Sequence, residues 1–223
     1  MTLPALRIAL PKGRLTKQTL DALRRADVLD ISEESFGRRL VVPCTPNPSV
    51  LHRPVEFLLL KNQDVPTYVE HGVAELGVCG SDVLEEARAE VFRPHTFPFG
   101  RCRIALAGRR DVDPAGLAQA EVVRIATKYP EITRRTLGAR GWQLQILPLG
   151  GSVELAATLG LADAIVDLVE TGTTLRENHL EIIEVLDTTR VHLIANRALC
   201  RRDAQDLMRL LRALGAEITT EET

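Results

Sequence analysis

Aromatic residues are scarce in this chain: Phe, Trp and Tyr make up only 4% of its 223 residues. Positive charge is not in excess either, because 28 Lys and Arg are balanced by 30 Asp and Glu, which leaves a net charge of −2. Proteins that bind nucleic acids combine a basic surface with aromatic side chains on which bases stack. The composition therefore predicts that nucleic acid is not a partner.

Paired cysteines, long apolar runs and an export signal are also missing from the sequence. Cys44, Cys79, Cys102 and Cys200 are widely spaced, which favours free thiols over disulfides or a zinc site. The five histidines show no metal-ligand spacing. No run reaches the roughly 20 apolar residues of a membrane span, and the first residues do not resemble a signal peptide. We therefore expect a cytoplasmic protein with no membrane partner.

Apolar residues are plentiful, at 45% of the chain, which is enough for one large or two small domains. Strand-like runs alternate with helix-like segments, the pattern of an α/β fold. Strands are expected over residues 6–10, 40–43, 55–60, 76–79, 101–107, 122–126, 142–146, 162–168, 181–186 and 191–195. Helices are expected over 16–26, 64–71, 132–140 and 203–214, and after Gly80, Gly151 and Thr174. Asp64, Asp82 and Asp203 are the expected helix caps.

One stretch, Ala162–Leu175, has the features of a phosphate-binding site. An apolar strand leads into the Thr-Gly-Thr-Thr loop of residues 171–174, and a helix follows. In such a loop successive backbone N–H groups point at an anion, and Gly172 allows a tight turn. Asp167 and Glu170 cannot hold a phosphate but suit ribose hydroxyls or a metal ion, so we expect a phosphorylated sugar. The alternative is an ordinary strand-to-helix turn with a threonine as N-cap.

A second candidate anion site lies at the turn Pro11–Arg14, between the first strand and the first helix. Lys12 provides a compact positive charge and Arg14 a planar fork, with Gly13 between them. The alternative is a surface turn that carries two solvated cations.

The chain also shows signs of two similar halves. Segments 72–80 and 160–168 share the order glycine, apolar residue, Ala, acid and strand, and each lies between a short helix and a further helix. Phe97–Gly100 forms a rigid apolar elbow, which we interpret as a crossing between two lobes. Two lobes of similar build, with a ligand cleft between them, fit this pattern.

Several motifs together resemble ATP phosphoribosyltransferase, the first enzyme of histidine biosynthesis. They are Leu10–Leu15, Asp64–Gly72, Gly100–Arg103, Lys128–Pro130 with Thr133–Arg135, Gly151–Leu155 and Asp167–Leu175. The chain ends near residue 223 without the C-terminal regulatory domain of the long form, so it is similar to the short form. The resemblance implies a hetero-oligomer with a regulatory subunit similar to histidyl-tRNA synthetase.

The resemblance also implies the fold and the domains. The expected fold is α/β, with two lobes resembling type II periplasmic binding proteins and the active site in the cleft between them. The natural crossings are the elbow near residues 97–101 and the strand region near 182–187. Lobe I would then comprise residues 1–100 plus 186–223, and lobe II residues 101–185.

The implied activity is that of a glycosyltransferase that uses ATP and phosphoribosyl diphosphate. N1 of the ATP adenine attacks C1 of the ribose and displaces pyrophosphate with inversion, and Mg²⁺ accompanies the diphosphate. Such an enzyme holds two highly charged substrates in line and offsets their charge. It needs no catalytic triad or Cys/His pair, and the sequence offers none.

The resemblance implies roles for residues of the threonine loop. Thr171, Gly172, Thr173 and Thr174 are expected to bind the ribose 5-phosphate. Asp167 and Glu170 are expected to act in catalysis, facing the ribose hydroxyls or Mg²⁺.

Basic residues are expected to meet the remaining phosphates. Lys12 and Arg14, as catalytic residues, and Gly13 would meet the pyrophosphate. Arg38, Lys61, Arg101 and Arg103 are candidates for the ATP phosphates and for the charge of the leaving group. Lys128, Arg134 and Arg135 are further candidates, for which the alternative is a solvated basic helix end.

Two departures from the family pattern and two other functions complete the expectations. Lys61 stands where the family has arginine. A lysine keeps the positive charge but lacks the planar fork with which arginine binds an anion through two hydrogen bonds. Thr136 and Leu137 stand where an aromatic pair is usual. A solute-binding protein of the same build is one alternative, although the sequence lacks a signal peptide. A salvage phosphoribosyltransferase is the other, although such enzymes carry two adjacent acids before the loop.

Overall fold

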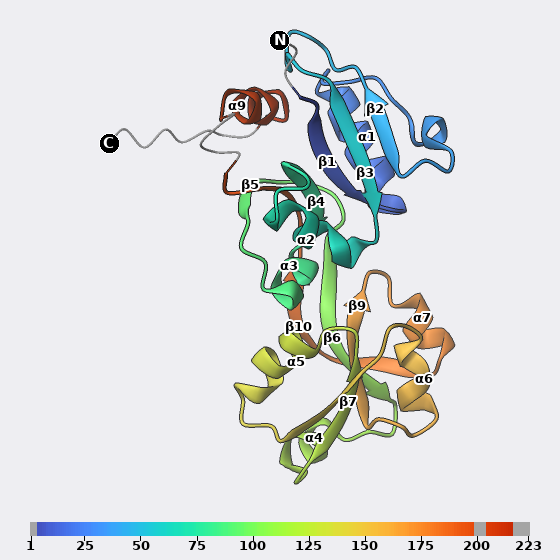
Figure 1. The fold of residues 1–223 in the computed structure, drawn as a ribbon. Helices are drawn as coiled ribbons and strands as arrows, with labels where there is room; N and C mark the ends of the chain where they lie inside the picture. Colours follow the sequence, from blue (N-terminus) through green and yellow to red (C-terminus); the bar gives the residue numbers. More distant parts are fainter. Residues whose placement is uncertain (1–3, 199–203, 216–223) are drawn as a thin grey trace. The chain divides into compact units, whose positions relative to one another are not determined.

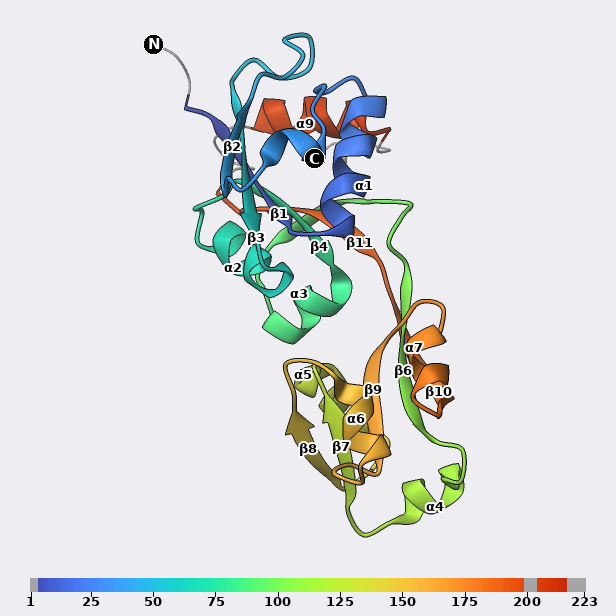
Figure 2. The same ribbon diagram turned by 90° about the vertical axis from the view of Figure 1, so that its right-hand side faces the viewer.

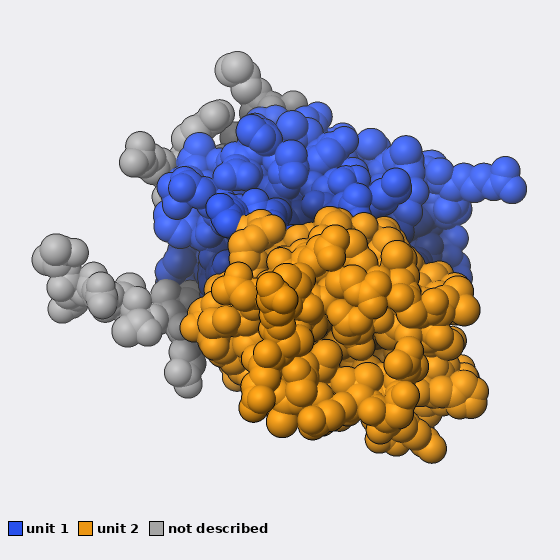
Figure 3. Space-filling model, turned by 90° about the horizontal axis from the view of Figure 1, so that it is seen from below, with its two compact units in different colours: residues 1–100, 191–223 blue, residues 101–190 orange. Residues whose placement is uncertain are grey.

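Two mixed β-sheets, one in each of two units, organise the chain in the computed structural model, which describes residues 4–198 and 204–215. Unit 1 comprises Met1–Gly100 and Val191–Thr223, and unit 2 comprises Arg101–Arg190. Figure 3 colours the two units separately. The chain therefore passes from one unit to the other twice.

The sheet of unit 1 has the strand order β2-β3-β1-β4-β11-β5 (Figure 1). Its strands are β1 (Leu6–Pro11), β2 (Val41–Cys44), β3 (Val55–Leu60), β4 (Leu76–Gly80), β5 (Phe92–Thr96) and β11 (Val191–Ala195). The central strand β1 is parallel to β3 and β4, whereas β2, β11 and β5 pair antiparallel to their neighbours. Because Pro11 pairs with Leu60, β1 and β3 end together, and Lys12 and Lys61 follow at the same edge.

Helices cover both faces of this sheet. On one face lie α1 (Arg14–Arg25), the 3₁₀ turn η1 (Glu33–Phe36) and α9 (Ala204–Ala213), which share a core of Leu, Val and Phe residues with the strands (Figure 2). On the other face, α2 (Val65–Glu70) and α3 (Ser81–Ala87) pack around Ala9 and Leu58 of the strands, and η2 (Asn62–Asp64) leads into α2. The alternation of side chains along each strand explains the two separate cores.

The sheet of unit 2 has the order β10-β6-β9-β7-β8. Its strands are β6 (Cys102–Arg109), β7 (Val123–Thr127), β8 (Leu144–Pro148), β9 (Ala164–Val169) and β10 (Leu180–Thr189). Its helices are α4 (Pro114–Gln119), α5 (Pro130–Thr133), the π-helical segment η3 (Arg134–Gly138), α6 (Val153–Thr158) and α7 (Thr173–Glu177). The core on one face joins the strands to α6 and α7, and the core on the other joins them to α5 and η3 (Figure 1).

Most expected elements are present, and the exceptions have local causes. The strand β5 and the helix α4 were not predicted, although Asp113 caps α4 by accepting hydrogen bonds from the backbone N–H groups of residues 115 and 116, at 3.0 Å each. The helix expected over 132–140 is divided into α5 and η3. The capping prediction for Asp82 is wrong, because β4 runs directly into α3 and Gly80 is the N-cap.

The remaining expectations concern a helix cap, the cysteines, the chain end and membrane-spanning helices. Asp64 precedes α2 but makes no capping hydrogen bond through its side chain. Cys44, Cys79 and Cys102 are free thiols, as expected. Asp203, Cys200 and the chain end at 219–223 lie outside the described residues. Among the helices that are described, none is long and apolar enough to cross a membrane.

The two passages between the units lie at Gly100–Arg101 and Arg190–Val191. The second lies beyond the expected boundary at residues 185 and 186, because β10 continues to Thr189, which pairs with Cys102. Gly100 has a φ of +69°, and a Cβ atom there would lie 2.6 Å from a methyl group of Val191. Only glycine fits this position without a shift of its neighbours.

A buried ion pair attaches α9 to the rest of unit 1. The guanidinium of Arg53 is 2% exposed and its Nε lies 3.0 Å from Oδ2 of Asp206 in α9. Glu75 lies farther away, with 3.9 Å between its Oε1 and the Nη1 of Arg53. A buried charge that loses its nearest partner is costly, since water cannot replace that partner.

We therefore expect Asp206→Ala to lower the free energy of unfolding by about 3 kcal/mol, measured by denaturant titration. Asp30→Ala is the matched control, because Asp30 pairs with Arg24 while its side chain is 94% exposed, and it should change stability little. Equal effects of the two substitutions would contradict the structural role of the Arg53–Asp206 pair.

Candidate functional site

Three loops of unit 2 leave the same edge of its sheet. The strands β7, β8 and β9 are parallel, so the segments that follow them leave the same edge of the sheet; Thr127 pairs with Pro148 and with Val166, and β9 continues to Val169. The backbone N–H of Leu149 donates to the carbonyl of Thr127 at 2.9 Å, which ties two of these loops together. Three of the motifs found in the sequence therefore meet at one edge, the usual place for ligands in sheets of this kind.

The threonine loop presents its hydroxyl groups to solvent. Thr171, Thr173 and Thr174 are exposed, and the hydroxyl oxygens of Thr171 and Thr173 lie 3.1 Å apart. Gly172 has a φ of +74° and is the N-cap of α7, with no capping hydrogen bond from a side chain. The N-cap is therefore Gly172 and not a threonine, although the Thr171 hydroxyl accepts the backbone N–H of Thr173 at 3.4 Å.

Arg176 is a member of this loop region that the sequence analysis missed. Its Nη1 donates to the carbonyl of Thr171 at 3.2 Å, and its Nη2 donates to the hydroxyl of Thr173 at 3.1 Å. The guanidinium thus braces the loop and adds positive charge beside it. Arg176 lies on α7 four residues after Gly172, about one helical turn away, which places it over the loop. This spacing in the sequence could have identified it.

The two acidic residues of the site differ in their environments. Asp167 is only 9% exposed, and its Oδ1 accepts a hydrogen bond from the backbone N–H of Leu168 at 2.8 Å. The Nζ of Lys128 lies 3.9 Å from its Oδ2. Burial raises the pKa of Asp167, and the nearby Glu154 adds to this rise, whereas the Leu168 amide and Lys128 counter it. Glu170, in contrast, is exposed.

Arg103 lies on the same face of the sheet as Asp167. In the antiparallel pair of β6 and β9, Arg103 is opposite Val169 and Ala105 is opposite Asp167. Side chains of opposite residues point to the same face, and so do those two positions apart on one strand. The structure therefore places Arg103 beside the threonine loop, while Arg101 is exposed just before β6.

Arg134 and Arg135 are on the other face of unit 2. They belong to η3, which packs on the core formed with Ile104 and Ile125. Arg134 forms an ion pair with Glu131, and Nη2 of Arg135 donates to Asp187 at 3.2 Å. These contacts favour a structural role for both arginines.

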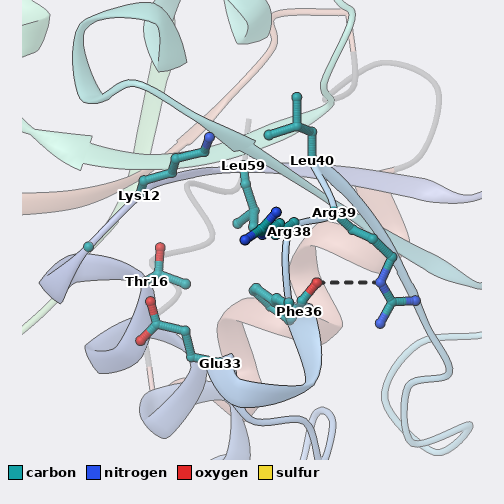
Figure 4. Close-up of a pocket in the computed structure, with 10 residues that line it drawn as sticks. Lys12, Thr16, Glu33, Phe36, Arg38, Arg39, Leu40 and Leu59 are labelled. Atoms are coloured by element: carbon teal, nitrogen blue, oxygen red, sulfur yellow. Dashed lines mark hydrogen bonds between the residues drawn. The ribbon is translucent and has the colours of Figure 1, made fainter.

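Unit 1 contains a pocket of about 270 Å³ at the end of β1 (Figure 4). Figure 4 shows Lys12, Thr16 and Glu33 on one side and Arg38, Arg39 and Leu40 on the other. The remaining lining residues are Gly13, Phe36, Gly37 and Leu59. Gly13 has a φ of +106°, which glycine adopts without strain, and it turns the chain from β1 into α1.

The cations of this pocket are not equivalent. The guanidinium of Arg39 donates to the backbone carbonyls of Ser35 and Phe36, at 2.6 and 3.4 Å. Within residues 4–198 and 204–215, the side chains of Lys12 and Arg38 make no hydrogen bond or ion pair. Lys12 and Arg38 are therefore the charges available to an anion, whereas Arg39 holds the loop.

Two other predicted basic residues lie near the pocket without lining it. Arg14 is exposed at the first position of α1. Lys61 is exposed and directly follows β3. It lies next to the turn Pro11–Arg14, because the backbone N–H of Lys12 donates to the Leu60 carbonyl at 2.9 Å. In the described part of the chain, no group of three or more His, Cys, Asp or Glu side chains is placed to hold a metal ion.

Comparisons with known proteins identify relatives across most of the chain. A family model described as ATP phosphoribosyltransferase matches residues 61–216. The ATP phosphoribosyltransferase of Caldicellulosiruptor bescii is 46% identical over 192 residues, which cover 86% of this chain and 88% of that protein.

Solved structures give the same result for the fold. A chain of the ATP phosphoribosyltransferase HisG:HisZ complex from Thermotoga maritima is 34% identical, with a TM-score of 0.76 over 94% of this chain and 96% of that one. A histidine kinase sensor domain with similarity to periplasmic binding proteins shares only the fold, at 18% identity and a TM-score of 0.54 over 95% and 89% of the two chains. The prediction of an α/β fold related to periplasmic binding proteins is therefore confirmed.

The different contacts of Arg38 and Arg39 predict different effects on anion binding. We expect Arg38→Ala to weaken the binding of inorganic tripolyphosphate about tenfold, as one charge–charge contact of roughly 1.4 kcal/mol is lost. Arg39→Ala, the matched control, should weaken it no more than about threefold, because that guanidinium already bonds to carbonyls. Isothermal titration calorimetry at low salt measures both, and equal losses would contradict the assignment.

Proposed function

The chain belongs to the ATP phosphoribosyltransferase family, and we propose that it is the catalytic subunit of the short form of this enzyme. The enzyme transfers the phosphoribosyl group of phosphoribosyl diphosphate to N1 of ATP and releases pyrophosphate, the first step of histidine biosynthesis. The observation that carries the proposal is the exposed hydroxyl loop beside a buried carboxylate, Asp167, inside the matched region 61–216.

Unit 2 is proposed to bind the phosphoribosyl group. The exposed hydroxyls of Thr171, Thr173 and Thr174, with the backbone of Gly172, suit the oxygens of the 5-phosphate. Arg176 adds positive charge next to the loop. Asp167 and Glu170 are proposed to accept hydrogen bonds from the ribose hydroxyls, because an ionised carboxylate can only accept hydrogen bonds and a hydroxyl can donate one.

Unit 1 is proposed to bind polyphosphate groups. Lys12 and Arg38 face a pocket in which neither side chain has a partner among the described residues, and Gly13 leaves the backbone open beside them. Lys12, Gly13 and Arg14 are assigned to the pyrophosphate. Arg38 and Lys61, with Arg101 and Arg103 of unit 2, are assigned to the ATP phosphates and to the charge of the leaving group.

The reaction needs positioning and charge compensation more than proton transfer. As the bond from adenine N1 to ribose C1 forms, the bond from C1 to the pyrophosphate oxygen breaks, and its electron pair leaves with that oxygen. The ribose carries positive charge in the transition state, which the carboxylates stabilise, while the cations stabilise the departing anion. Alignment of two bound reactants alone accounts for roughly 7–11 kcal/mol of the barrier in well-oriented systems.

We propose that Mg²⁺ enters as part of the diphosphate substrate. The described residues form no metal cluster, and Mg²⁺ commonly binds through substrate phosphates with few protein ligands. The ion offsets the negative charge of the leaving group. No protein residue is assigned to it.

We further propose a hetero-oligomer and a cytoplasmic location. The relative from Thermotoga maritima was solved as a HisG:HisZ complex, and this chain is 34% identical to a chain of that complex. The proposed partner is a regulatory subunit resembling histidyl-tRNA synthetase. The cytoplasm supplies both substrates.

Incubation of the chain with ATP, phosphoribosyl diphosphate and Mg²⁺ tests the proposal. We expect phosphoribosyl-ATP and pyrophosphate, detected by mass spectrometry, with and then without the regulatory subunit. A chelator in excess over Mg²⁺ should stop turnover. A solute-binding protein yields no product in any mixture, and a salvage enzyme turns over a free base instead of ATP, so either result would refute the proposal.

The threonine loop predicts a selective loss of one substrate. Thr171→Val combined with Thr174→Val removes two exposed hydroxyls, so the Kd for phosphoribosyl diphosphate should rise about tenfold and that for ATP less than about twofold. Thr158→Val is the control, because the Thr158 hydroxyl bonds to the Glu154 carbonyl on α6 at 3.0 Å. Equal losses for both substrates would mean that the loop is misassigned.

A further inference from the structure

The carboxylate of Asp167 has one oxygen engaged and one oxygen directed at a cation. Its Oδ1 accepts the Leu168 N–H at 2.8 Å, whereas its Oδ2 lies 3.9 Å from the ammonium of Lys128. The longer distance exceeds that of a hydrogen bond, so the Lys128 ammonium acts on Oδ2 through its charge. Oδ2 therefore keeps the capacity to accept a hydrogen bond from a substrate hydroxyl.

Lys128 is held at this place by buried threonine hydroxyls. Thr127 is fully buried, and its hydroxyl donates to the Val166 carbonyl of β9 at 2.7 Å and accepts the N–H of Tyr129 at 2.9 Å. The hydroxyl of Thr133, also fully buried, lies 3.5 Å from that of Thr127. Thr127, which precedes Lys128, is thus bonded to the strand that carries Asp167, and Tyr129, which follows Lys128, is bonded to Thr127.

The surroundings of Asp167 disfavour the negative charge of its carboxylate, so a neighbouring cation is needed to stabilise that charge. The residue is nine-tenths buried, and Glu154 on α6 is near enough to disfavour a second negative charge. Leu168 contributes one backbone N–H, and Arg103 is on the same face, opposite Val169 at the end of β9. Lys128 is the one ammonium within ion-pair distance of the carboxylate among the described residues.

We propose that Lys128 is a positioning residue that acts through Asp167: its ammonium keeps the buried carboxylate charged and oriented toward the ribose hydroxyls. This inference rests on the proposed function. It also assigns Lys128 to the phosphoribosyl substrate and away from the ATP phosphates.

A double-mutant cycle tests the inference in the full-length protein with its regulatory subunit. The Kd for phosphoribosyl diphosphate and the kcat are measured for the wild type, Lys128→Met, Asp167→Asn and the double variant. We expect each single variant to bind phosphoribosyl diphosphate about tenfold more weakly and the double variant to be no worse than Asp167→Asn alone. The KM for ATP should change by less than about twofold.

Two further variants separate positioning from stability. Lys128→Arg keeps the charge and should restore the Kd to within about threefold of the wild type. Arg124→Met is the matched control: its guanidinium pairs with Asp163 at 2.6 Å at the opposite end of β7, so it should lower the melting temperature and leave the Kd unchanged.

Three results would overturn the inference. The first is that the losses of affinity of the two single variants multiply in the double variant, which would mean that Lys128 binds the substrate by itself. The second is that Lys128→Met changes the KM for ATP as much as the Kd for phosphoribosyl diphosphate. The third is that Lys128→Met binds phosphoribosyl diphosphate as the wild type does. A wild-type protein that forms no phosphoribosyl-ATP would instead refute the proposed function, so the two failures are distinguishable.

Discussion

Parallel pairing of β7 with β9 is the constraint on which the site of unit 2 depends. Parallel strands end at one edge, so the turn that carries Lys128 and the threonine loop after Val169 lie at the same edge, although Thr127 and Val169 are 42 positions apart in the sequence. The buried Thr127 hydroxyl fastens this arrangement by donating to the Val166 carbonyl of the neighbouring strand. A loop with exposed hydroxyls is useful only if such a rigid edge positions it.

Two ion pairs among the described residues involve buried charge, with different consequences. Arg53 and Asp206 pair at 3.0 Å, and this contact holds α9 against the sheet of unit 1. Asp167 and Lys128 are farther apart, at 3.9 Å, and the lysine is 38% exposed. We assign the closer pair to stability, whereas the looser pair leaves a carboxylate oxygen for the proposed substrate. The distance between the groups thus distinguishes a structural pair from one suited to binding.

Local sequence signals predicted most of the strands and the two glycine-containing turns that follow β1 and β9, because apolar runs and such turns report directly on backbone conformation. They missed β5, which contains Pro94 and pairs only with β11 at the edge of its sheet, where proline is tolerated. They also missed the roles of Arg176 and Lys128 and the restraint on Arg39. Lys128 and Asp167 are 39 positions apart and come close only on folding, which no local pattern encodes. Arg176 and Arg39 contact residues at most five positions away, so their spacing was a signal that the sequence did contain.

The candidate sites of the two units differ in their chemistry, and the proposed reaction accounts for the difference. The 5-phosphate stays on the ribose throughout, so hydroxyls and backbone groups that bind it equally before and after transfer are sufficient. The pyrophosphate gains negative charge as it leaves, so it requires cations whose attraction increases in the transition state. Unit 1 offers Lys12 and Arg38 in a pocket, and unit 2 offers a loop of three exposed threonines. Under this proposal the pocket of unit 1 supplies cations where charge changes, and the loop of unit 2 supplies hydroxyls and backbone groups, with Arg176 bonded to them, where it does not.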